Sequence, residues 1–236
     1  MSLGGSQERS GALIAPIHEE LRQDVWDGDK LRPEVRKKLL EIAAEFKKYL
    51  GIPLSVKDVL FMGSLANYNY TDESDIDLHL LVDFDEIDGP ELLRELFTAK
   101  KSLFNDEHDI FIGPAEVELY VQDVDEPNAS TGVYSIRDDK WIQKPKHERP
   151  RIDQKAILTK ARDLMDQIDT LIKHDASAAH YQRLKDKIKK MRGSGLKKGG
   201  EYSTENLAFK VLRRNGYLEK LGDAATKAFD EELSMG

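Results

Sequence analysis

Residues 61–82, FMGSLANYNYTDESDIDLHLLV, join a small turn to a strand that carries two aspartates. From Ser74 to Val82 hydrophobic and polar residues alternate, which predicts a strand with one buried face. Side chains two residues apart on a strand point to the same face. Asp75 and Asp77 can therefore hold the same metal ion or metal pair.

Gly63 and Ser64 form the turn ahead of this strand. A glycine lets the backbone come close to a ligand, and a serine offers a hydroxyl and an N–H group to phosphate oxygens. A phosphate cradle next to paired carboxylates is what metal-assisted phosphoryl or nucleotidyl transfer needs. The stretch therefore points to chemistry on a phosphate substrate.

The composition is that of a soluble globular protein with one large domain or two small ones: 236 residues, 39% hydrophobic and 34% charged. The absence of Cys excludes disulfides and thiolate zinc sites and is consistent with a cytoplasmic protein. No apolar run approaches the roughly 18 residues of a membrane span, so we expect no membrane partner. We expect residues 1–12 to be a flexible tail or a cloning scar.

The net charge of −8 is unevenly distributed. Residues 183–220 contain twelve Lys and Arg but four Asp and Glu, so this segment carries +8 and the remainder −16. A basic segment of this kind either faces an anion or forms the solvated faces of helices. The overall acidity and the few aromatic residues in the segment argue against DNA binding as the main role.

The hydrophobic spacing predicts an α+β (mixed α/β) fold, with a C-terminal helical part after a Pro-rich boundary at 143–151. The predicted domains are 13–150 and 151–236. In the first we expect helices over 31–50 and from residue 88, and strands over 58–62, 74–82, 110–112, 117–121, 134–136 and 141–142. In the second we expect helices through 157–172, 181–191 and 203–214, with a loop at 193–200.

A third acid on a neighbouring strand would complete such a site, because it could bind the second metal ion and take the acceptor's proton. Glu118 is the first candidate, since it alternates with the hydrophobic Val117 and Leu119 in mid-strand. Glu116 lies on the same face and is the alternative.

The Gly63-Ser64 turn and Ser74-Asp75-Ile76-Asp77-Leu78 resemble the signature of the DNA polymerase β-like nucleotidyltransferases. Broader similarity, from Trp26-Asp27-Gly28-Asp29 to Glu205-Asn206-Leu207, resembles uncharacterised phage-type nucleotidyltransferases. The resemblance implies a short mixed sheet flanked by helices, and transfer of a nucleoside monophosphate from a triphosphate to a hydroxyl. The acceptor could be a small molecule, a protein or RNA.

The resemblance also implies roles for single residues. Gly63 and Ser64 would contact the triphosphate, while Asp75 and Asp77 would bind two Mg²⁺ or Mn²⁺ ions, with Glu118 as the third acid. Tyr68 is a candidate for stacking on the base, and packing in the loop is the alternative.

The chain departs from the signature directly after the turn. Many members with small-molecule substrates have a basic residue and a second glycine there, whereas this chain has Leu65-Ala66-Asn67-Tyr68-Asn69-Tyr70. Lys210, Arg213 and Arg214 are candidates to meet the phosphate charge from the C-terminal part. The alternative is an inactive module that binds a nucleotide or a partner on the same fold.

Overall fold

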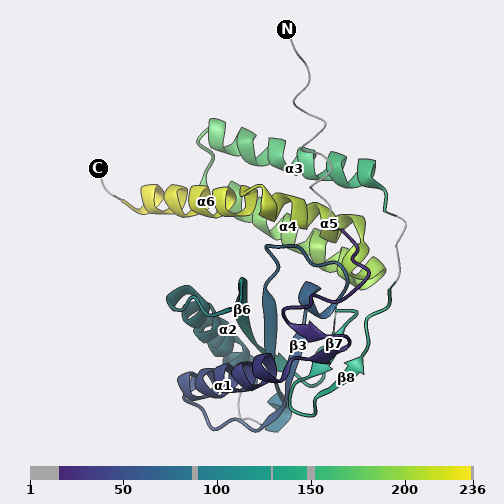
Figure 1. Ribbon diagram of the computed structural model, residues 1–236. Coiled ribbons are helices and arrows are strands. Elements are labelled where there is room, and N and C mark those ends of the chain that lie inside the picture. Colours follow the sequence, from purple (N-terminus) through teal and green to yellow (C-terminus); the bar gives the residue numbers. More distant parts are fainter. Residues whose placement is uncertain (1–15, 87–89, 129, 148–151, 235–236) are drawn as a thin grey trace. The chain divides into compact units, whose positions relative to one another are not determined.

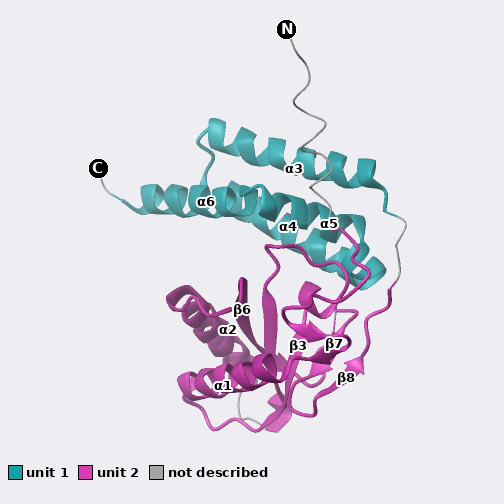
Figure 2. Ribbon diagram, in the orientation of Figure 1, with its two compact units in different colours: residues 1–14, 150–236 teal, residues 15–149 magenta. Residues whose placement is uncertain are grey.

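The computed structural model describes residues 16–86, 90–128, 130–147 and 152–234. The described residues divide into two compact units: the first lies within residues 15–149 (magenta in Figure 2) and the second within residues 150–236 (teal). The predicted tail, residues 1–12, lies outside the described residues.

The first unit is built on a mixed six-stranded sheet with the order β5-β6-β4-β3-β7-β8. Strands β4 and β6 are parallel, and the other neighbours in the described part of this sheet are antiparallel. This confirms the predicted short mixed sheet. The strands are β3 (Val56–Met62), β4 (Ile76–Val82), β5 (Phe111–Ile112), β6 (Ala115–Asp123), β7 (Val133–Ser135) and β8 (Lys140–Gln143), with β1 (Trp26–Asp27) and β2 (Lys30–Leu31) in a separate pair.

Helices α1 (Pro33–Leu50) and α2 (Pro90–Glu107) supply the main core of this unit together with the sheet (Figure 1). Pro33 suits the first turn of α1, and Gly51 ends it in the left-handed conformation at φ 67°. Short 3₁₀ turns occupy Ser64–Ala66 and Phe84–Glu86. The face of the sheet that joins this core carries Val59, Phe61, Ile76, Leu78, Leu80, Val82, Val117 and Leu119.

Trp26 fixes the turn that follows β3. Its indole is fully buried and donates a hydrogen bond from Nε1 to the carbonyl of Leu65 at 2.7 Å. The ring stacks on Phe61 and on Trp141, with centroid distances of 5.3 and 4.8 Å. Because buried aromatic contacts of this kind hold a segment in one place, the glycine–serine turn has a rigid support.

Helix α2 lies along β6, and its Asn105 side chain forms two hydrogen bonds with the β6 backbone, as the backbone of a neighbouring strand would. Asn105 donates to the carbonyl of Leu119 and accepts from the N–H group of the same residue, both at 3.2 Å. The hydrophobic residues of α2 do not all face the core. Phe97 and Phe104 are buried on the side of the helix that also carries Asn105, whereas Leu92, Leu96 and Leu103 are exposed.

The second unit consists of helices α3 (Gln154–Lys173), α4 (Ala178–Gly199), α5 (Thr204–Arg214) and α6 (Tyr217–Leu233). Ser203 is the N-cap of α5, since its hydroxyl accepts a hydrogen bond from the Asn206 N–H group. Among the described residues, no helix is both long and apolar enough to span a membrane. Two hydrophobic clusters hold the helices together; their buried members are Leu164, Ile168, Tyr181, Leu184, Ile188, Leu212 and Leu221, and Ile157, Ala161, Leu207, Ala208 and Val211.

The predicted loop at 193–200 was wrong, because α4 continues to Gly199. One glycine of this segment, Gly195, serves packing rather than a turn. A Cβ atom at the buried Gly195 would lie 2.5 Å from Cβ of Glu205 and 2.8 Å from Oγ of Ser203. Glycine therefore allows α4 to approach the start of α5 closely.

We expect Gly195→Ala to destabilise the helical unit by about 1–3 kcal/mol, the usual cost of overpacking a close contact. Gly193→Ala is the matched control, since a Cβ there meets nothing within 4 Å, and it should gain up to about 1 kcal/mol of helix propensity. Urea unfolding followed by circular dichroism at the helical band would measure both. Equal stabilities of the two variants would contradict this packing role of Gly195.

Candidate active site

The Asp77 carboxylate lies directly against the glycine of the turn. A Cβ atom at Gly63 would fall 1.7 Å from Oδ2 of Asp77, and Gly63 has φ +82° and ψ −165°, a conformation that only glycine adopts readily. Asp77 is the second residue of β4, whereas Ser74 and Asp75 precede the strand that was predicted to contain them. Turn and carboxylate are therefore in contact.

Glu118 on β6 stands directly opposite Asp77 in the parallel pairing of β4 and β6. Neighbouring strands are about 4.8 Å apart, so the two side chains lie side by side on one face of the sheet. Glu116 instead pairs with Phe111 on β5 and lies outside the β4–β6 ladder. Of the two candidates for the third acid, the register places Glu118 next to Asp77.

Tyr120 connects Glu118 with His79 on the same face. Its hydroxyl donates a hydrogen bond to Oε2 of Glu118, and its ring stacks on His79 at a centroid distance of 4.6 Å and an interplanar angle of 18°. His79 and Tyr120 are register partners on β4 and β6. This acidic face of the sheet, which carries Asp77 and Glu118, thus has an aromatic neighbour, Tyr120, that fixes one oxygen of Glu118.

Lys101, which was not among the predicted site residues, reaches this face from α2. Its ammonium nitrogen lies 4.0 Å from the ring centroid of Tyr120. Burial lowers the pKa of Lys101, while the charges of Glu118 and Asp77 act in the opposite direction. The sequence contains a signal for this position. Lys101 lies four residues after Phe97 and three before Phe104, a spacing that puts it on the same side of α2 as these two buried residues.

We expect His79 to make the stability of the protein depend on pH. Burial lowers the pKa of His79 from 6.5 to about 4; the Gln122 side chain opposes this shift and Lys101 adds to it. Between these values the unfolded chain binds more protons than the folded protein, so the free energy of unfolding rises as pH increases from about 4 to 6.5. Across this pH range the free energy of unfolding should rise by about 3 kcal/mol.

His79→Phe keeps a ring next to Tyr120 and removes the titration. The difference in unfolding free energy between pH 5 and pH 7 should be smaller in this variant by about 2 kcal/mol. Tryptophan fluorescence in urea would report it, because Trp26 and Trp141 both belong to the first unit. His108→Phe, at an exposed position, is the control; the same pH dependence in the wild type and His79→Phe would rule out the effect.

The polar groups of the turn already have partners within the protein. The Gly63 N–H group donates to Oγ of Ser130 at 3.3 Å, and the Ser64 hydroxyl donates to Oγ of Ser74 at 2.8 Å. Oγ of Ser74 also accepts from the N–H group of Thr71 at 2.9 Å. Ser130 was missed, since nothing in the sequence indicates that its segment lies beside the turn.

Of the other predicted nucleotide contacts, one packs against a residue outside this cluster of side chains and two belong to the other unit. Tyr68 packs edge-on against His147 at a centroid distance of 4.8 Å. Lys210 and Arg213 are on α5 of the helical unit, half-buried and exposed respectively. Their roles toward a nucleotide stay predictions.

The acidic face offers the oxygen ligands that Mg²⁺ and Mn²⁺ prefer, namely a few carboxylates with room for phosphate oxygens. It also accommodates a positive charge, since the Lys101 ammonium interacts with both Asp77 and Glu118. Over the described ranges, however, no three His, Asp or Glu side chains are already arranged to hold a metal ion. The predicted ligands fit in chemical type, and Asp75, Asp77 and Glu118 would have to converge on binding.

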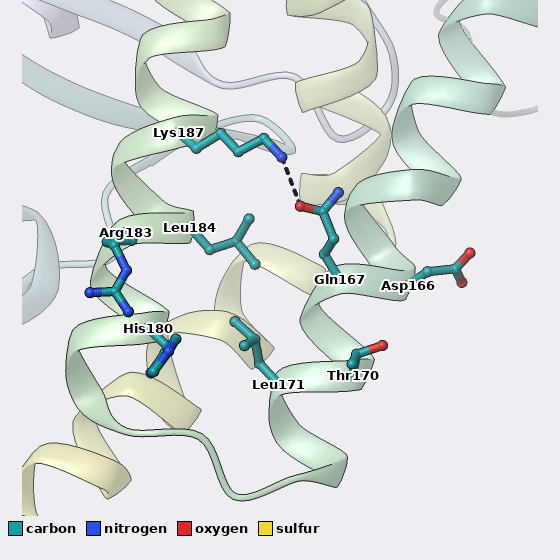
Figure 3. A pocket seen from close by; sticks show the side chains of 8 residues that line it. All are labelled: Asp166, Gln167, Thr170, Leu171, His180, Arg183, Leu184 and Lys187. Atoms are coloured by element: carbon teal, nitrogen blue, oxygen red, sulfur yellow. Dashed lines mark hydrogen bonds between the residues drawn. The ribbon is translucent and has the colours of Figure 1, made fainter.

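A groove between α3 and α4 is the other candidate site (Figure 3). Asp166 stands on the α3 side, Arg183 and Lys187 stand on the α4 side, and Lys187 donates to Oε1 of Gln167 at 2.8 Å. One carboxylate among several basic groups lacks the paired acids that metal-assisted transfer needs. The acidic face of the sheet is therefore the better candidate for an active site.

No protein-family model matches the sequence, and no curated protein matches it. One solved structure is similar, a STING-associated CdnE c-di-GMP synthase from Capnocytophaga granulosa, with 13% identity over 86% of this chain and 84% of that one. The TM-score is 0.23. A score this low does not establish a shared fold, so the proposal below rests on the residues of this protein.

Proposed function

We propose that the protein is a divalent-metal-dependent nucleotidyltransferase. The observation that carries this proposal is the position of Asp77, which touches the glycine of the turn on one strand and stands opposite Glu118 on the next. Two carboxylates and the turn proposed to contact phosphate thus share one end of one sheet face. Metal-assisted transfer to a hydroxyl needs these groups together.

In the proposed reaction an acceptor hydroxyl oxygen forms a bond to the α-phosphorus of a nucleoside triphosphate. The bond between the α-phosphorus and the bridging oxygen breaks, and pyrophosphate leaves. Asp75 and Asp77 would hold Mg²⁺ or Mn²⁺, which when bound stabilises the charge on the phosphate oxygens. Glu118 would take the proton of the hydroxyl through Oε1, because Tyr120 already donates to Oε2.

Gly63 and Ser64 would meet the triphosphate by exchanging partners. The Gly63 N–H group contacts Ser130 through a long 3.3 Å hydrogen bond, which a phosphate oxygen could replace with a shorter and charge-assisted one. Tyr68 would stack on the base, and Lys210 and Arg213 would add positive charge.

The test is release of pyrophosphate from each of the four ribonucleoside triphosphates in the presence of Mg²⁺ or Mn²⁺. The protein itself, a small-RNA pool and a lysate would serve as acceptors. Release that requires the metal and disappears in Asp75→Ala/Asp77→Ala supports the proposal. No release with any triphosphate, under conditions where a nucleotide measurably binds, would contradict it.

That second result would favour a binding module on the same fold. The internal hydrogen bonds of the turn favour this alternative, because Ser64 and Gly63 already have partners in Ser74 and Ser130. A binding module predicts that Asp75→Ala leaves nucleotide affinity unchanged, as isothermal calorimetry would measure. A transferase predicts weaker binding of the metal–nucleotide complex in this variant.

A further inference from the structure

We propose that Lys101 is the resident counter-ion of the acidic face and that a divalent cation bound by Asp77 and Glu118 must compete with the charge of its ammonium group. This inference rests on the proposed function, because it describes how metal would enter the same site. It assigns to Lys101 a positioning role that the glycine–serine and aspartate signature does not contain.

The position of Lys101 follows from the way α2 packs. Phe97 and Phe104 anchor the helix in the core, and Asn105 is hydrogen-bonded to the backbone of β6. Lys101 lies on the same side of the helix as these anchors, at spacings of three and four residues. Its half-buried side chain therefore has limited freedom and ends over the ring of Tyr120.

The charges on this face favour a nearby cation. Asp77 and Glu118 stand opposite each other on adjacent strands, and like charges in such pairs destabilise a sheet. Tyr120 brings the ammonium of Lys101 to this pair, since the same tyrosine carries Lys101 on its ring and donates its hydroxyl to Glu118. The charge interactions of Lys101 extend to both carboxylates, and also to Asp106.

A lysine in this place does part of what a bound metal would do, because its single positive charge offsets one of the two negative charges. A divalent cation at the same two acids must compete with this charge. Removing the ammonium should therefore raise the affinity for the metal. A lysine with a purely structural role would not change metal affinity in this direction.

The experiment compares Mn²⁺ binding, measured by electron paramagnetic resonance without nucleotide, in the wild type, Lys101→Met and Lys101→Arg. We expect Lys101→Met to bind Mn²⁺ about fivefold or more tightly, the usual lower range for coupled ligands, and Lys101→Arg to resemble the wild type. Lys100→Met is the matched control. Lys100 is also half-buried on α2, but its ammonium faces the ring and carbonyl of Tyr49.

Unchanged or weaker Mn²⁺ binding in Lys101→Met would overturn the inference. Lys101→Gln provides a second variant should Lys101→Met fail to fold, with the same expected direction. Asp77→Asn separates this inference from the proposed function. If Mn²⁺ binding is lost in Asp77→Asn but unchanged in Lys101→Met, only the role of Lys101 fails. If Mn²⁺ binding persists in Asp77→Asn, the metal site itself is wrong and both ideas fail.

Discussion

Asp77→Asn is expected to lower the rate of pyrophosphate release by about 10³-fold or more, which corresponds to roughly 4 kcal/mol of lost transition-state stabilisation. The amide keeps the shape of the carboxylate but removes the charge that would hold the metal. The fold should persist, because the substitution also removes the repulsion between Asp77 and Glu118.

Asp72→Asn is the matched control for this prediction. Asp72 is exposed in the turn ahead of β4, only a few residues from the site. The Asp72→Asn variant should release pyrophosphate at a rate close to that of the wild type. The circular dichroism spectra of the wild type, Asp77→Asn and Asp72→Asn should be the same. A folded Asp77→Asn protein with wild-type turnover would contradict the assignment.

Gly63→Ala should have the largest combined effect on stability and activity. The backbone at φ +82° and ψ −165° costs a residue other than glycine about 1–3 kcal/mol. The added Cβ would also overlap the Asp77 carboxylate, with contacts of 1.7 Å to Oδ2 and 2.8 Å to Cγ. Asp77 must move, so we expect lost turnover even at temperatures where the variant remains folded.

Gly113→Ala tests whether backbone strain alone explains such a result. Gly113 also has a positive φ, +59°, but a Cβ there would meet its nearest neighbour, Oδ2 of Asp24, at an ordinary 3.8 Å. Urea unfolding, monitored by tryptophan fluorescence, should show that this variant is less stable than the wild type. Its rate of pyrophosphate release should be unchanged. Equal turnover in Gly63→Ala and the wild type would show that the contact with Asp77 does not position the carboxylate.

Local patterns were sufficient to predict most elements of the fold. Pro33 and Gly51 bound α1 because one suits a first turn and the other a left-handed end. The alternation from Ile76 to Val82 predicted β4, and Ser203 marked the start of α5. These signals depend on a few neighbouring residues, which a sequence displays directly.

Features that depend on contacts between distant segments were missed. Gly195 appeared to be a loop residue, because its close approach to Ser203 and Glu205 cannot be read from its own segment. The exposed side of α2, with Leu92 and Leu103, could not be separated from the buried side by hydrophobicity alone.

The candidate site divides in the same way. The alternation predicted that Asp75 and Asp77 share a face, but it could not choose between Glu116 and Glu118. That choice depends on the register of β6 against β4, which is set by the packing of the whole sheet. Lys101 was missed for a similar reason. Its spacing from Phe97 and Phe104 indicates the side of α2 on which it lies, but only the packing of α2 along β6 brings it to the acids.

The most direct test of the central claim follows which phosphorus atom is transferred. The protein, Mg²⁺ and an acceptor pool would be incubated in parallel with α-labelled and γ-labelled nucleoside triphosphates. The proposed reaction predicts that label from the α-position appears on an acceptor, that label from the γ-position appears in pyrophosphate, and that both signals disappear in Asp77→Asn. Transfer of the γ-label to an acceptor, or no transfer of either label in any acceptor pool, would contradict nucleotidyl transfer at this face.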